Sequence, residues 1–147
     1  MKKLICFVLI LCVIPLSAMA VEPKDIINEW NAKTIIFPAP KLSADQFSDN
    51  VFTGNGWKVA FHEESGKISS YGVFAKNADD FIPLCVVAGI MMVKDYEVSE
   101  LTTFVGKLTS SYFLLKSGEE IVPATFGMYI FAIDKTADGF FFTITGL

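Results

Sequence analysis

Hydrophobic and polar residues alternate in two stretches of the chain, which indicates β-strands with one buried face. In the first, Trp57, Val59 and Phe61 alternate with polar or small residues, and a second alternating run, ISSYGVFAK, follows the turn EESGK. In the second, TFGMYIFAI and FFFTITGL are separated by DKTADG. Because a glycine-containing turn between two such runs is typical of a hairpin, the pattern predicts β-hairpins at about 57–76 and 121–147.

Two apolar segments lie between the predicted hairpins. The second segment, residues 99–116, gives the clearer signal. Its hydrophobic side chains recur at helical spacing and predict an amphipathic helix that ends before Gly118. Residues 81–93, by contrast, are apolar on every side, and two aspartates before them favour a helix start. This run is longer than most strands and contains alanine and glycine, so we expect a buried helix at about 80–94. A buried strand is the alternative.

The region before the first hairpin has weaker signals. PKDIINEWNAK, residues 23–33, has apolar residues at helical spacing and a proline that a first helical turn tolerates, which predicts a short N-terminal helix. An extended connector with two prolines follows. The capping-box spacing of Ser43 and Gln46 then predicts a brief helix that includes Phe47 and Val51.

This order of elements predicts an α+β fold. We expect an antiparallel sheet built from the two hairpins, with the central helical pair packed on one face and the short N-terminal helix beside it. No repeat or long linker divides the chain, so residues 21–147 are expected to form a single globular domain.

The last predicted hairpin is more apolar than a sheet with one solvent face requires. Phe141 lies in a run of three phenylalanines, and Tyr129 and Phe131 point to one side of the strand before it, opposite Phe126. Three interpretations are open. The N-terminal helix covers the second face, the sheet curls around its own core, or Tyr129, Phe131 and Phe141 belong to an exposed surface that binds a protein partner or a second copy of the chain.

The first twenty residues have the three regions of a secretory signal peptide, namely Lys2 and Lys3, an apolar stretch, and small residues at a cleavage site that ends at Ala20. The apolar stretch is too short to remain as a membrane span. We therefore expect residues 1–20 to be removed and the domain to be exported through the inner membrane of a bacterium, either to the periplasm or outside the cell. Cys12 follows a leucine, whereas lipid attachment needs a small residue there, so a lipid anchor is disfavoured.

Charge and cysteine content narrow the possible partners. The chain has 12 lysines, no arginine and 16 acidic residues, for a net charge of -4, and loss of the two signal-peptide lysines changes this to -6. The lysines are dispersed, and arginine is the main side chain for recognising phosphates and base edges. We therefore expect neither nucleic acid nor an anionic membrane surface as a partner. Cys85 would be the only cysteine left, so no internal disulfide is expected.

Few residues suit catalysis or metal binding. His62 is the only histidine, and one histidine with one cysteine is too few for the usual zinc or copper site. Cys85 and His62 together would make a thiol nucleophile and its base, but a cysteine within an apolar helix is expected to be an inert buried side chain. The neighbouring carboxylate pairs fall at predicted turns and helix ends. We expect no catalytic residue, cofactor or metal.

These observations favour a small exported bacterial binding protein, such as an inhibitor or immunity-type partner of another protein, over an enzyme. An acidic surface and aromatic sheet residues would provide the contact. A self-assembling structural or envelope component is the alternative, and a cysteine-dependent hydrolase is a more remote one.

Overall fold

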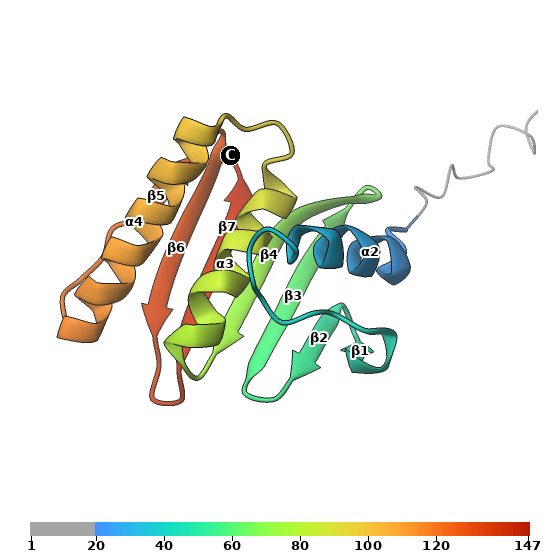
Figure 1. Ribbon diagram of the computed structural model, residues 1–147, viewed down its shortest axis with the longest axis horizontal. Coiled ribbons are helices and arrows are strands. Elements are labelled where there is room, and N and C mark those ends of the chain that lie inside the picture. Colours follow the sequence, from blue (N-terminus) through green and yellow to red (C-terminus); the bar gives the residue numbers. More distant parts are fainter. Residues whose placement is uncertain (1–19) are drawn as a thin grey trace, which may run out of the picture.

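The computed structural model describes residues 20–147, so the predicted signal peptide, apart from Ala20, lies outside the described residues. In the described part of the chain, seven strands form one antiparallel sheet and three α-helices lie on one of its faces (Figure 1). The expected α+β fold is therefore confirmed. The sheet is wider than the two predicted hairpins because short strands extend both of its edges.

The strands follow the order β1-β2-β3-β4-β7-β6-β5 across the sheet, and every neighbouring pair is antiparallel. Their bounds are β1 Phe47–Ser48, β2 Val51–Gly54, β3 Trp57–Glu64, β4 Lys67–Ala75, β5 Ala124–Phe126, β6 Tyr129–Lys135 and β7 Phe140–Gly146. The helices are α2 Pro23–Lys33, α3 Ala78–Met92 and α4 Val98–Ser117, and η1, Ala44–Gln46, is a single 3-10 turn.

Helix α3 is apolar on all sides because other elements surround it. It packs on β4 and β7, and α2 and α4 contact its two flanks (Figure 1). The helix begins after Asn77, whose side-chain oxygen accepts a hydrogen bond from the backbone N–H of Asp80. The prediction of a helix over 81–93 is confirmed, and the strand alternative is wrong. The residues on its second apolar face are all buried: Val86, Val87, Ile90 and Val93.

The brief helix predicted after the proline connector is wrong beyond its first turn. The predicted capping box forms, but η1 ends at Gln46 and the chain continues as β1 and β2. Asp49 and Asn50 between these strands have φ values of 51° and 61°, which suit a two-residue hairpin turn. The turn pairs Phe47 with Phe52 and so places the Phe52 ring in the core.

The segment TFGMYIFAI is also not one strand. β5 ends at Phe126 and β6 begins at Tyr129, and Gly127 in the turn between them has a φ of 58°. Because residues paired across two strands share a face, Phe126 lies on the same face as Tyr129 and not opposite to it. The Phe126 ring stacks on Phe104 of α4 with a centroid distance of 4.4 Å.

The second face of the sheet is not covered by the N-terminal helix. Helix α2 lies on the same side as α3 and α4 (Figure 1), and its Trp30 ring packs near Tyr71 of β4. On the opposite side, Phe74 and Phe141 form an aromatic pair with a centroid distance of 5.0 Å. Around this pair the central strands expose short polar or charged residues, among them Lys58, His62, Thr143 and Thr145.

Candidate functional site

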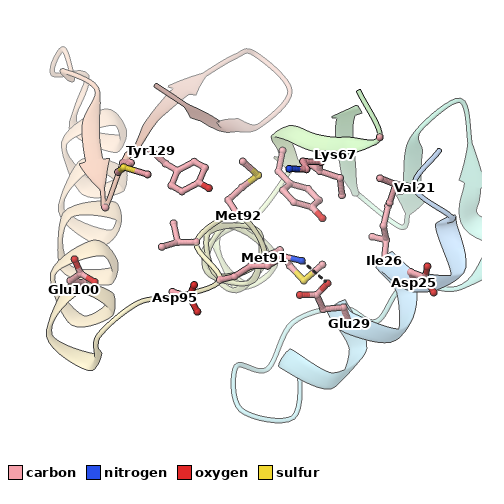
Figure 2. Close-up of a pocket in the computed structure, with 17 residues that line it drawn as sticks. Val21, Asp25, Ile26, Glu29, Lys67, Met91, Met92, Asp95, Glu100 and Tyr129 are labelled. Atoms are coloured by element: carbon pink, nitrogen blue, oxygen red, sulfur yellow. Dashed lines mark ion pairs between the residues drawn. The ribbon is translucent and has the colours of Figure 1, made fainter. Parts of the chain in front are cut away.

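A cleft of about 760 Å³ opens at the C-terminal end of α3, and we call it the α3 cleft. It is bounded by α2, by the β3–β4 and β5–β6 turns and by the start of α4, and its size lies within the usual range for ligand pockets. Figure 2 shows Met91 and Met92 at the end of α3, between Tyr129 on one side and Val21 and Ile26 on the other.

Methionine is concentrated in this cleft. The only methionines that follow the predicted cleavage site are Met91, Met92 and Met128, and all three line it. Methionine side chains are flexible and polarisable, so they adapt to apolar groups of different shape. The sequence shows that the predicted mature chain has only three methionines, but it does not show that they lie together. The β5–β6 turn of the structure brings Met128 to the same cleft as Met91 and Met92.

Charged side chains surround the apolar floor of the cleft. Carboxylates come from α2 on one side and from α4 and the loop before it on the other (Figure 2). The Lys94 ammonium lies 3.7 Å from the Glu29 carboxylate, and both groups are well exposed. Four carboxylates and two ammonium groups line the site, which leaves it net negative: Asp25, Glu29, Asp95 and Glu100, with Lys67 and Lys94.

Tyr71 contributes the most conspicuous polar atom of the cleft. Its side chain is 1% exposed, and its hydroxyl has no hydrogen-bond partner among the described residues. Burial, and secondarily the negative charge of Glu29, raises the pKa of Tyr71, so the hydroxyl stays protonated at physiological pH. Leaving a buried hydroxyl unpaired costs about 1–3 kcal/mol, and such an atom in a ligand-sized cleft is a natural contact for a bound group.

The structure does not bring the three predicted surface residues together. Tyr129 is partly buried and lines the α3 cleft. Phe131 is 2% exposed and packs edge-on against Phe104 in the core, so it is not accessible to a partner. Phe141 is 44% exposed but lies on the other face of the sheet. Only Tyr129 therefore belongs to the cleft.

The structure also keeps Cys85 and His62 apart. Cys85 is fully buried in α3, on the helix-covered face of the sheet. His62 is exposed on β3 and alternates with the core residues Phe61 and Val59, so its side chain points to the opposite face. The sheet separates the two side chains, and no serine, cysteine or histidine is among the described residues that line the α3 cleft.

Cys85 is expected to be inert in the native protein. Burial raises the pKa of the Cys85 thiol, so the reactive thiolate is scarce at neutral pH, and no reagent can reach the sulfur without opening the core. An aromatic disulfide reagent should therefore label a protein that begins at Val21, and so lacks Cys6 and Cys12, only after denaturant is added, as followed by absorbance. Cys85→Ala is the blank, and labelling of the folded protein as fast as a free cysteine would contradict this prediction.

The first residue of the predicted mature chain is anchored at the edge of the cleft. The backbone nitrogen of Val21 donates a hydrogen bond to the Glu63 carboxylate, at a distance of 3.1 Å, and Val21 lines the α3 cleft. If signal peptidase cleaves after Ala20, this nitrogen becomes a charged α-ammonium group. The contact would then be a charge-assisted hydrogen bond, which is stronger than a neutral one.

Glu63→Gln is expected to lower the free energy of unfolding of a chain that begins at Val21 by about 1 kcal/mol, because it removes the anionic partner of the ammonium group. The loss should be smaller in a chain that keeps Ala20, since its Val21 nitrogen is a neutral amide. Urea unfolding of the four proteins measures the difference. Glu64→Gln, an exposed neighbour, should have little effect in either chain, and equal losses for both Glu63→Gln proteins would show that the ammonium charge is unimportant.

Among residues 20–147, no three side chains of the metal-ligating types His, Cys, Asp and Glu form a group that could hold an ion. None of the helices described is both long and apolar enough to cross a bilayer. Comparison of the chain with protein-family models, curated proteins and solved structures finds no match, so its own geometry is the basis for any functional conclusion.

Proposed function

We propose that this chain is an exported binding protein whose α3 cleft engages a segment of another protein, as an inhibitor or immunity-type partner would. The observation that supports it is the cleft itself, an open, methionine-lined cavity. Among the residues that the structure describes, its buried tyrosine hydroxyl has no partner and its lining contains no serine, cysteine or histidine. A site of this composition is suited to holding an apolar group. The predicted signal peptide supports export.

A polypeptide suits the surroundings of the cleft better than a small molecule that fits within it. The apolar surface continues past the cleft, because Met128 is 77% exposed and Leu147 is 84% exposed. These residues are neighbours, since the backbone N–H of Leu147 donates a hydrogen bond to the carbonyl oxygen of Met128 at 3.2 Å. An extended segment could place one side chain in the cleft and rest its neighbours on the exposed surface of Met128 and Leu147. Buried anchors of this kind contribute most of the binding free energy at protein interfaces.

The test is capture of a partner by tagged protein that begins at Val21, followed by reconstitution of the complex from purified components. Tyr129→Ala removes a ring from the cleft, and Phe141→Ser is the matched control on the opposite sheet face. We expect wild type and Phe141→Ser to form the complex and Tyr129→Ala to lose it while remaining folded by circular dichroism. Loss of binding only in Phe141→Ser would move the interface to the open face, and a concentration-dependent oligomer with no partner would favour self-assembly.

A further inference from the structure

We infer that the α3 cleft selects a cationic amphipathic segment, in which an apolar side chain enters the methionine floor while a neighbouring Lys or Arg meets the carboxylate rim. This inference rests on the proposed function, because it names the chemistry of the segment that the cleft would engage. Three independent features of the cleft support it.

The first feature is the floor. Met91 and Met92 are 5% and 7% exposed, yet they form the wall of a cavity large enough for a ligand group, together with Ile26 and Ile68. Their unbranched side chains can rotate to admit an aromatic or aliphatic group without movement of the backbone. Met128 also lines the cleft but is largely exposed, so the apolar surface extends from solvent into the cleft.

The second feature is the charge of the rim. Asp25 and Glu29 lie on one side of the cleft, and Asp95 and Glu100 lie on the other (Figure 2). Only one of the two lysines, Lys94, forms an ion pair with a rim carboxylate, that of Glu29. In a chain that begins at Val21, the α-ammonium group adds a positive charge at the edge of the cleft, but it is paired with the Glu63 carboxylate, so the rim stays net negative. The excess of carboxylates attracts a cationic segment and repels an acidic one.

The third feature is Tyr71. Its buried hydroxyl has no hydrogen-bond partner among the described residues, and Tyr71 lines the cleft together with Met91 and Met92. If an entering segment displaces the side chains that bury this hydroxyl, the hydroxyl can donate to a backbone carbonyl of the segment or accept from an ammonium group. The free protein therefore carries an unfavourable buried atom that binding would satisfy.

The probe pair is two acetylated, amidated pentapeptides, Lys-Leu-Phe-Leu-Lys and Glu-Leu-Phe-Leu-Glu, which differ only in the sign of the end charges. The protein that begins at Val21 is labelled with ¹³C at its methionine methyl groups, so that every signal comes from the cleft. We expect the basic peptide to shift these signals and to bind about tenfold more tightly than the acidic one, with the difference shrinking as salt is added.

Matched variants assign the effect to the rim and to Tyr71. The double variant Asp25→Asn and Asp95→Asn should lower the affinity for the basic peptide about two- to fivefold per carboxylate. The control, Asp134→Asn with Asp138→Asn, changes two carboxylates that do not line the cleft and should leave this affinity unchanged. Tyr71→Phe should bind the peptide more weakly although its thermal midpoint is unchanged or raised, because it removes an unpaired polar atom from the free protein.

Equal affinity for both peptides, or methionine signals that stay unmoved at millimolar basic peptide, would overturn the inference. These outcomes are separable from those of the capture experiment, since the peptides need no natural partner. A reconstituted complex that Tyr129→Ala abolishes, combined with equal peptide binding, would retain the proposed function and remove the charge selection. Selective binding of the basic peptide, with no protein partner found by capture, would retain the charge selection and remove the proposed function.

Discussion

Replacing Phe104 by alanine is expected to lower the free energy of unfolding by about 3–5 kcal/mol. This ring is 1% exposed and joins α4 to the C-terminal half of the sheet. It stacks on Phe126 at 4.4 Å and meets the edge of Phe131 at 5.0 Å, so its removal leaves a cavity lined by rings that cannot collapse together. Chemical denaturation followed by circular dichroism measures the loss.

Phe113→Ala is the matched control for Phe104→Ala, because it removes the same side chain from the same helix at a position that is 59% exposed. Its effect on the free energy of unfolding should stay within about 0.5 kcal/mol. Similar losses for the two variants would mean that the contact between α4 and the sheet is not the packed core described above.

Replacing Gly89 by alanine is expected to cost about 1–3 kcal/mol, although alanine is the better helix former. A Cβ at this position of α3 would lie 2.6 Å from two carbon atoms of the Phe104 ring. That ring is held by Phe126 and Phe131 and has little room to move away. Thermal and chemical denaturation should both show the destabilisation.

Gly106→Ala on α4 is the control, since an added Cβ there meets no atom within 4 Å, and it should stabilise the protein by up to about 1 kcal/mol. A double-mutant cycle of Gly89→Ala with Phe104→Leu tests the contact directly. The smaller leucine should accommodate the new methyl group, so the combined loss should be less than the sum of the two single losses. Additive losses would show that the two helices do not meet at this point.

The elements that sequence patterns predict well are those in which local and tertiary preferences agree. Helix α4 has an apolar stripe and a glycine with left-handed backbone at its end, and hairpin β3–β4 has clear alternation, so both were predicted near their observed bounds. Strands β1 and β2 were not predicted, because the capping box was interpreted as the start of a longer helix and the two-residue turn at Asp49 and Asn50 was not considered. A capping box fixes only the first helical turn, and here the chain leaves the helix at once.

The periodicity of hydrophobic residues could not predict that Phe131 is buried, nor which residues line the cleft. The tight turn at Gly127 puts Phe126 on the face of Tyr129, and α4 covers that face, so a ring assigned to a surface lies in the core. The cleft combines residues from α2, the end of α3 and two β-turns. No local pattern places such distant segments together, because their contact depends on strand order.

The position of β7 has a consequence for how the chain folds after synthesis. This strand follows β6 in the chain, yet it lies between β4 and β6 and contributes Phe142 and Ile144 to the core. Without residues 140–146, β4 and β6 have unpaired edges and α3 loses one of the strands on which it packs. A chain without β7 therefore cannot complete its sheet, so formation of the native core depends on pairing between segments that are far apart in the sequence, which is a slow kind of contact to form.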